Sequence, residues 1–342
     1  MIEIDCSMGE GGGAIIRAAT ALATLTERTI TLKNIRKKRP NPGLQAQHIE
    51  SLKALQQLTG VKIEGLKLGN SMIRMTKPTI RGTECQVKIP TAGNIPLLIQ
   101  AIMYYSLGRS EKIKLIVEGG ATHSKWAPTI EFIDLVTHKI IEKMGGKIDI
   151  NVKNYGFYPK GGAKCEIVYA KKAKLQAIEL IKQGKLKETL AISVASKNLS
   201  ERKVAERQLE SFRKGYQEKS LVNPILKYVN TLSPGSALTI VNKYEKGGIK
   251  GFSTIGERGI SAESIGSMAL SHFGKLNIET SIDSYAADQL IVPIALAKGK
   301  SCITTDIISN HTKTNIEVVK RILDIQIEVE RTESGFKIIK HQ

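Results

Sequence analysis

Long apolar runs are missing from this sequence. The longest candidate, residues 290–297, contains Pro293 and is far shorter than the roughly 18–20 apolar residues that cross a bilayer. The first five residues include Glu3 and Asp5, and they lack the basic start and apolar stretch of a signal peptide. We therefore expect a soluble, cytoplasmic protein with no membrane partner.

Cysteine is also scarce. The four cysteines form no CxxC pair and no cluster with histidine, so their spacing does not fit a structural zinc site. In the cytosol, where thiols are kept reduced, we expect them to be free and buried.

Acidic residues are outnumbered: 32 Asp and Glu stand against 51 Lys and Arg, which gives a net charge of +19. Such an excess attracts polyanions, so a nucleic acid or a polyphosphate is one candidate partner. A lysine-coated surface of the kind found in hyperthermophile proteins would give the same count. The remaining composition, 41% apolar and 24% charged, is that of an ordinary globular protein.

A helix–break–strand pattern recurs along the chain. Apolar residues first repeat at helical spacing and then at every second position, with a glycine or a short break between the two patterns. The four segments are 51–64, 132–152, 267–279 and 317–329. The breaks at Gly60 and Gly146 lie 86 residues apart, and Asp324 follows 178 residues after Gly146.

This spacing predicts an α/β (α+β) fold of three related units with a smaller α/β module inserted before the last. At 342 residues the chain has room for about two domains. We expect a main domain over 1–184 and 277–342 and an inserted domain over 185–276. Helix–glycine–strand units are common in α+β proteins, so the pattern alone leaves an unrelated arrangement open.

Two segments near the N-terminus suggest anion binding. Gly9-Glu10-Gly11-Gly12-Gly13 follows an expected strand, 2–5, and opens an expected helix, 14–25, with Arg17 one turn in. Glycines let a phosphate approach helix-start N–H groups, and Glu10 is compatible with that if it holds a divalent cation; a tight turn is the alternative. Residues 36–39 then place four cations before a helix expected to carry Pro42 in its first turn, followed by Gln47 and His48. This segment is either a polyanion site or an ordinary basic loop.

Further polar residues stand in apolar or turn segments. Gln100 lies in an apolar helix and needs a partner, either a backbone carbonyl or a ligand. The turn 154–162 combines glycines, aromatic residues and a lysine, and either stacks a base or only connects two strands. Asp288 is explained most simply as a helix N-cap. The cationic helix around 202–214 is a further candidate contact for a nucleic acid.

His311 lies where an expected strand meets a helix, a position that often carries catalytic groups. Asn310, Thr312 or Thr314 would cap that helix. A lone histidine is more often a hydrogen-bonded structural group than a nucleophile, and its local sequence does not decide between the two.

Taken in order, these segments closely resemble the RNA 3′-terminal phosphate cyclase family, in its archaeal-type, true cyclase branch. The matching pieces extend over nearly the whole chain: 5–17, 35–48, 92–100, 119–120, 156–162, 256–263, 287–297 and 311–319. Each piece is weak alone, whereas the ordered set is specific.

The resemblance implies a fold, an activity and its partners. It implies three βαβα-type units with a smaller domain inserted after the second. The implied reaction uses ATP to convert an RNA 3′-phosphate to a 2′,3′-cyclic phosphodiester, through a histidine–AMP adduct and an RNA adenylate. The implied partners are RNA with a 3′-phosphate end, ATP and a divalent metal, Mg or Mn.

The resemblance also implies roles for single residues. His311 matches the nucleophile and Glu10 the metal-binding glutamate. Positions near the phosphates, the RNA end or the nucleotide pocket are matched by Arg17, Arg36, Arg39, Gln47, His48, Gln100, Tyr285, Asp288 and Gln289.

Two other functions remain open at this point. A non-catalytic, cyclase-like RNA-binding factor of ribosome biogenesis would share the fold, although His311 together with Glu10 argues against it. A small-molecule enzyme built on similar units, such as an enolpyruvyl transferase, is disfavoured by the charge of +19.

Overall fold

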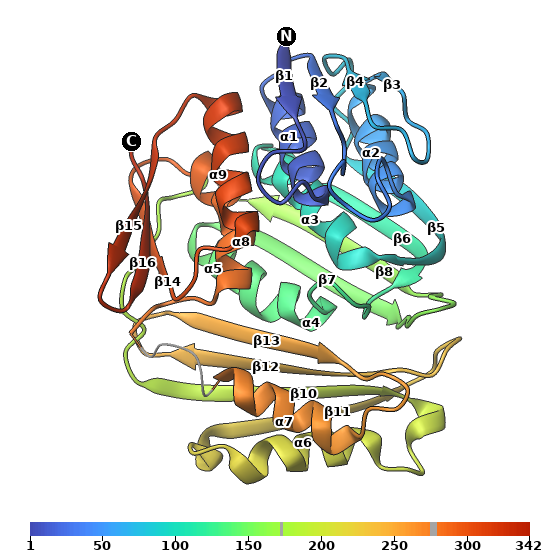
Figure 1. Ribbon diagram of the computed structural model, residues 1–342, viewed down its shortest axis with the longest axis vertical. Coiled ribbons are helices and arrows are strands. Elements are labelled where there is room, and N and C mark those ends of the chain that lie inside the picture. Colours follow the sequence, from blue (N-terminus) through green and yellow to red (C-terminus); the bar gives the residue numbers. More distant parts are fainter. Residues whose placement is uncertain (172–173, 274–278) are drawn as a thin grey trace.

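The computed structural model describes residues 1–171, 174–273 and 279–342. In these ranges the chain forms four four-stranded sheets with helices packed between and beside them (Figure 1). The protein thus has the mixed α/β architecture expected from the sequence. No helix within the described ranges is both long and apolar enough to cross a membrane.

The first unit ends near residue 80 and carries the glycine-rich loop. Its elements are β1 (Ile2–Asp5), α1 (Gly13–Leu25), β2 (Ile30–Lys33), α2 (Ala46–Thr59), β3 (Ile63–Glu64) and β4 (Ile73–Met75). Strand β1 pairs parallel with β2, and the sheet order is β1-β2-β4-β3. Gly60 ends α2 in the left-handed conformation, at φ 65°, as the helix–break–strand pattern predicted.

The second unit repeats this order of strands. Its elements are β5 (Glu84–Asn94), α3 (Ile95–Leu107), β6 (Ile113–Ala121), α4 (Ile130–Phe132), the π-turn η1 (Ile133–Thr137), α5 (His138–Lys143), β7 (Gly146–Asn154) and β8 (Lys164–Lys171). The sheet order is β5-β6-β8-β7, with β5 and β6 parallel.

The third unit has the same order again, but its first strand is separated from the rest. Its elements are β9 (Glu179–Leu180), α8 (Ser284–Leu296), β14 (Ser301–Thr305), α9 (Asn310–Leu323), β15 (Ile327–Thr332) and β16 (Gly335–Lys340). The sheet order is β9-β14-β16-β15, and β9 pairs parallel with β14. Three units of one topology confirm the repeat inferred from the spacing.

A fourth sheet with two helices lies between β9 and α8. Its elements are β10 (Leu186–Ser196), η2 (Lys197–Leu199), α6 (Val204–Gly215), η3 (Lys219–Leu221), β11 (Val222–Val229), β12 (Ser236–Tyr244), β13 (Ile249–Ile255) and α7 (Ala262–Phe273). The extra segment therefore enters inside the third unit, after its first strand. The expected domain limits 185–276 stay a prediction, and both residue 276 and most of the expected strand 275–279 lie outside the described residues.

The central strands β10 and β12 of this fourth sheet are buried on both faces, whereas the edge strand β11 is partly exposed. One face packs on α6 and α7 through a small apolar cluster that includes Phe212 and Ile240. The other face meets the second unit, because Gly251 of β13 lies against the side chains of Phe132 and Val136. Burial on both sides explains why β10 reads as an almost continuous apolar run, Leu190–Ala195, instead of an alternating strand.

Helices of different units share the central core. Helix α1 packs beside both α9 and α3, and α8 packs beside α9. Figure 1 shows α9 beside α1, with α8 below α9, above the fourth sheet. This packing brings the starts of α1 and α9 together, although almost 300 residues separate them in sequence.

Candidate active site

The glycine-rich loop before α1 lies against the first turns of α9. The backbone N–H of Glu10 donates to Thr314 Oγ1 at 3.3 Å. Gly9 has a φ of 54°, and a Cβ at this position would overlap the Thr314 hydroxyl. Glycine at position 9 therefore allows the loop to reach the start of α9, where N–H groups without intrahelical partners face the same space.

Three of the sequence-predicted residues meet at this point. The Glu10 carboxylate contacts the Arg39 guanidinium with Oε1 and His311 Nδ1 with Oε2. Glu10 comes from the loop before α1, Arg39 from the loop after β2, and His311 from the first turn of α9. The His311 side chain keeps 45% of its surface exposed, so a ligand can reach the ring.

The surroundings of His311 favour its uncharged form. Burial lowers the pKa of His311, the charges of Arg17 and Arg39 lower it further, and Asp288 opposes them. A neutral ring carries one hydrogen, and with that hydrogen on Nδ1, the nitrogen that contacts Glu10, Nε2 keeps its lone pair. An imidazole in this state can act as a nucleophile through Nε2.

Asp288 holds the first turn of α9. Its Oδ1 accepts from Ser309 Oγ at 2.5 Å and from the Thr312 hydroxyl, and Asn315 Nδ2 donates to its backbone oxygen at 2.8 Å. Asp288 is thus not the N-cap of α8 that we expected. Asp283 has that place, and it accepts from the N–H of Ala286 at 2.8 Å.

The cap of α9 also differs from expectation. Ser309 caps the helix by accepting from the N–H of Thr312 at 3.0 Å, whereas we expected Asn310, Thr312 or Thr314 in that role. Two of these three serve the site differently, because Thr312 binds Asp288 and Thr314 binds the Glu10 backbone. A serine three residues before Thr312 was the available signal for the cap.

Arg17 and Gln100 form a second polar group beside this centre. Arg17 Nε donates to Gln100 Oε1 at 2.7 Å, so the glutamine in the apolar helix α3 has an arginine as its partner. Burial lowers the pKa of Arg17 to about 10, which leaves it charged at neutral pH. Tyr104, one turn beyond Gln100, was not singled out from the sequence. Its buried hydroxyl lies near Arg17, and burial raises the tyrosine pKa.

His48 presents a buried donor to the start of α1. Its Nδ1 accepts from the N–H of Gln45 at 3.0 Å, so Nε2 carries the hydrogen of the neutral ring. Burial, with help from Arg17 and Arg36, lowers the His48 pKa to about 3. Nε2 has no hydrogen-bond partner within the described part of the chain. A Cβ on Gly13 would overlap this nitrogen, so glycine at position 13 lets the buried His48 ring pack against the start of α1.

The other predicted residues lie around this centre without direct contacts to His311. Arg36 Nε donates to the backbone oxygen of Asn41 at 3.2 Å, and Gln47 lies half-buried in the first turn of α2. Pro42 was wrongly expected inside that turn. It precedes the helix, which begins at Ala46 after the N-cap Gln45.

Two residues of α8 that were expected to line the nucleotide pocket differ in how exposed their side chains are. Tyr285 is 48% exposed, and its ring meets Phe132 edge-on at 6.4 Å between centroids. Gln289 is buried: its Oε1 accepts from Thr137 Oγ1 at 2.8 Å, and its amide donates to the Tyr285 backbone oxygen at 3.3 Å. The Gln289 side chain is therefore engaged with η1 and its own helix.

Glu10 is the carboxylate through which this site could hold a metal ion. Within the described residues, no three His, Cys, Asp or Glu side chains gather into a metal-ligand cluster. A single carboxylate fits Mg²⁺, which commonly takes one or two protein carboxylates and completes its shell with water and substrate phosphates.

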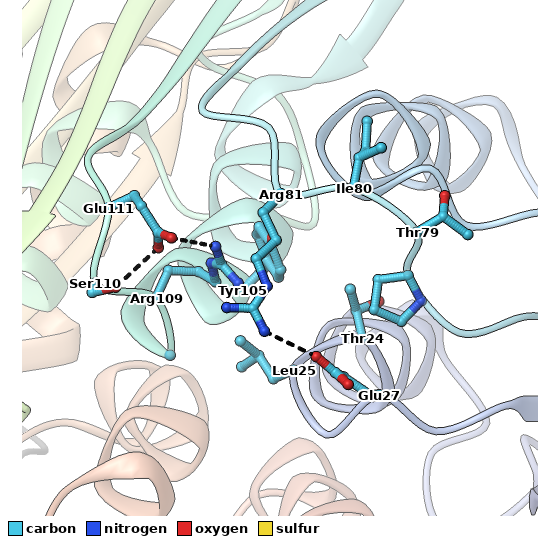
Figure 2. A pocket seen from close by; sticks show the side chains of 12 residues that line it. Thr24, Leu25, Glu27, Thr79, Ile80, Arg81, Tyr105, Arg109, Ser110 and Glu111 are labelled. Atoms are coloured by element: carbon cyan, nitrogen blue, oxygen red, sulfur yellow. Dashed lines mark hydrogen bonds and ion pairs between the residues drawn. The ribbon is translucent and has the colours of Figure 1, made fainter.

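A pocket of about 300 Å³ lies elsewhere, at the C-terminal ends of α1 and α3 (Figure 2). Its two arginines are paired, Arg81 with Glu27 at 3.1 Å and Arg109 with Glu111 at 2.7 Å. Helix α1 has 13 residues, so its two ends lie about 20 Å apart. The pocket is therefore separate from the His311 centre, and its charges are already balanced.

Comparison with known proteins identifies the family of this chain. A family model described as RNA 3′-terminal phosphate cyclase matches residues 8–329. A Methanosarcina barkeri protein named RNA 3′-terminal phosphate cyclase is 37% identical over 340 residues, which cover 99% of each chain. A protein of the same name from Archaeoglobus fulgidus is 33% identical over 341 residues and 99% of each chain. A third, from Pyrobaculum aerophilum, is 33% identical over 95% of this chain and 93% of its own. The chain therefore belongs to the RNA 3′-terminal phosphate cyclase family.

Proposed function

We propose that the protein uses ATP to convert the 3′-terminal phosphate of RNA into a 2′,3′-cyclic phosphodiester. The observation that carries the proposal is the meeting of His311, Glu10 and Arg39 beside the start of α1. Relatives from Methanosarcina barkeri and Archaeoglobus fulgidus carry the name of the same activity.

In the first step, His311 Nε2 attacks the α-phosphorus of ATP. A P–N bond forms, the P–O bond to the β-phosphate breaks, and pyrophosphate leaves, so that AMP is attached to the ring. Glu10 would support this step because its carboxylate contacts Nδ1 and would stabilise the positive charge that develops on the imidazole.

In the second step, an oxygen of the RNA 3′-phosphate attacks the phosphorus of the adduct, and the histidine leaves. The product is an RNA end activated by AMP. The neighbouring 2′-hydroxyl then attacks the activated 3′-phosphorus, loses its proton and expels AMP. This closure is intramolecular, so proximity favours it strongly.

The surrounding residues would bind the negative charge. Arg17, Arg36 and Arg39 would pair with phosphates, and His48 Nε2–H would donate to one of their oxygens. Gln100 would orient Arg17 through their 2.7 Å hydrogen bond. Gln47 would line the phosphate site from the first turn of α2.

The α8 residues would serve the nucleotide less directly. The exposed Tyr285 ring offers a face for the base. Asp288 would position His311 through the first turn of α9, and Gln289 would support Tyr285 through its backbone oxygen.

Glu10 would also hold the divalent metal, Mg or Mn. When bound, the ion would neutralise phosphate charge. A carboxylate in contact with both Arg39 and His311 places that ligand beside the nucleophile.

The activity is tested with an RNA whose 3′-terminal phosphate is radiolabelled. Incubation with ATP and Mg²⁺ should make the label resistant to phosphatase, and His311→Asn should abolish the conversion. RNA with a 3′-hydroxyl should not react. A phosphatase-sensitive label after incubation with folded wild-type protein that binds ATP would contradict the proposal and favour a non-catalytic RNA-binding factor.

A further inference from the structure

Four loops meet at one edge of the molecule. They connect β6 to α4, β7 to β8, β11 to β12, and β13 to α7. The N–H of Lys160 donates to Ser233 Oγ at 3.1 Å, and Lys125 forms an ion pair with Glu257. Loops from the second unit and from the inserted segment are thus fastened to each other here.

Two aromatic side chains protrude from this edge. Trp126, the only tryptophan of the sequence, is 96% exposed, and Tyr158 is 74% exposed. Trp126 has a φ of 61°, a left-handed conformation that a bulky residue adopts only where its surroundings impose it. An exposed indole on a strained backbone gains little from folding, which is evidence for a ligand.

Buried contacts hold the Trp126 loop from inside. His123 Nε2 lies 2.7 Å from Glu131 Oε2, its Nδ1 lies 2.9 Å from Thr122 Oγ1, and its ring stacks on Phe157 at 5.1 Å. His123 and Glu131 are both buried. Because this network joins the start of the Trp126 loop to the turn that carries Tyr158, both rings are displayed from a fixed base.

The same loop is joined to the helix that carries Gln100. Asn94, the N-cap of α3, donates to Ser124 Oγ at 2.6 Å. Gln100 lies six residues further along α3, about 9 Å at 1.5 Å per residue. Gln100 binds Arg17. At the other end of the loop, Phe132 meets the Tyr285 ring. The edge that carries Trp126 and Tyr158, called the aromatic edge below, is therefore close enough to the proposed phosphate site for a few nucleotides of RNA to span the distance.

We propose that Trp126 and Tyr158 stack bases of the RNA strand immediately 5′ of its terminal phosphate. This inference rests on the proposed function and names how the substrate is held. Base–aromatic stacking tolerates any sequence, because every base has a π-face. Exposed Lys160 lies two residues from Tyr158 in sequence and supplies charge for the backbone. Lysine is depleted in protein–protein interfaces, so this combination favours a nucleic acid over a protein partner.

The single tryptophan makes direct binding measurable. Single-stranded RNA of about eight nucleotides with a 3′-phosphate should quench Trp126 fluorescence to saturation, whereas ATP alone should not. A dye-labelled copy of the RNA would report binding independently by anisotropy. Saturated anisotropy without any change in tryptophan emission would overturn the proposal.

Substitution separates stacking from chemistry. Trp126→Ala and Tyr158→Ala should each raise the KM for RNA about tenfold or more, and Trp126→Phe should restore most of the loss. Labelling of the protein by ATP without RNA should be unchanged in all three. Leu68→Ala, which removes a side chain that is 64% exposed in the first unit, is the matched control and should have no effect.

The outcomes distinguish this inference from the proposed function. An unchanged KM for RNA in Trp126→Ala would refute base stacking on the aromatic edge and leave the proposed cyclase activity intact. If the wild-type protein fails to cyclise RNA but that RNA quenches Trp126 fluorescence, base stacking on the aromatic edge is supported and the proposed reaction is refuted.

Discussion

The hydrogen-bond partner of the buried Gln100 side chain could be identified only from the folded structure. Its position in an apolar helix indicated that it needs a hydrogen bond, and the structure supplies Arg17, 83 residues away, at 2.7 Å. The amide leaves the guanidinium its full charge while fixing its direction. We expect that neutrality to matter for phosphate binding.

Replacing Gln100 by glutamate tests this directly. Gln100→Glu keeps the acceptor for Arg17 but adds a negative charge that neutralises the guanidinium and repels phosphates. We expect a rise in the KM for ATP or for 3′-phosphorylated RNA of about tenfold or more, since charged hydrogen bonds contribute about 1.5–3 kcal/mol. Gln100→Ala should cause a smaller rise. Equal or tighter substrate binding by Gln100→Glu would contradict a phosphate role for Arg17.

The types of the site residues could be predicted, whereas several of their contacts could not. Glu10, Arg39 and His311 were named from the sequence for separate roles, and the structure places their side chains in contact. The hydroxyls of Ser309 and Thr314 were missed as parts of the site, because serine and threonine near a helix start are ordinary caps. Only the packing of α9 on α1 and α8 shows which hydroxyl binds Asp288 and which binds the Glu10 backbone.

At the scale of elements, the start of α8 depends on one buried carboxylate. Asp283 Oδ1 caps the helix by accepting from Ala286, and Oδ2 accepts from the N–H of Gly251 in β13 at 2.8 Å. Burial raises the Asp283 pKa from 3.8 to about 7, and nearby Asp306 acts in the same direction. Asp283 therefore couples the inserted sheet to the helix that carries Asp288.

This coupling predicts a pH dependence of stability. A carboxyl group whose pKa is higher in the folded state than in the unfolded state stabilises the fold, and its full contribution is present at pH values below the unfolded pKa. That contribution is lost as pH rises through the folded value, so the free energy of unfolding should fall between about pH 4 and pH 7. Urea unfolding at pH 5 and pH 8 measures the change. Asp283→Asn should be less stable at pH 5 but show a smaller pH difference; an unchanged difference would exclude Asp283 as its source.

Helix ends were harder to predict than helices. Strand 2–5 and the helix that follows it were predicted to within a residue, because their apolar periodicity is strong. The caps at Gln45, Asp283 and Ser309 were not, since each has other capping residues or a proline nearby that fit the sequence pattern as well. Capping depends on the direction from which the chain enters the helix, which tertiary packing determines.

At the scale of the molecule, three units of one strand order surround a shared core, and the inserted segment begins after β9. The spacing of helix–break–strand patterns indicated this arrangement because each unit repeats the same chain length. It could not show that the insertion falls within the third unit, since β9 has only two residues and leaves almost no periodic signal.

The net charge of +19 predicts salt-dependent RNA binding, and the fold offers two surfaces for it. For single strands, log K falls with log salt by about 0.7 per neutralised phosphate. Lys160→Ala, beside the aromatic edge, should therefore reduce the slope by about 0.7. Lys214→Ala on the cationic helix α6 should leave it unchanged. The opposite pattern would place the RNA strand on α6.

The central claim is that His311 carries AMP, and covalent labelling tests it most directly. Wild-type protein incubated with α-³²P-ATP and Mg²⁺, without RNA, should retain label after denaturation. The bond should be broken by acid and survive alkali, as a phosphoramidate does. His311→Asn should bind ATP and take no label, and label on wild-type protein should pass to RNA ending in a 3′-phosphate. Wild-type protein that binds ATP yet stays unlabelled, or His311→Asn that labels normally, would contradict the account.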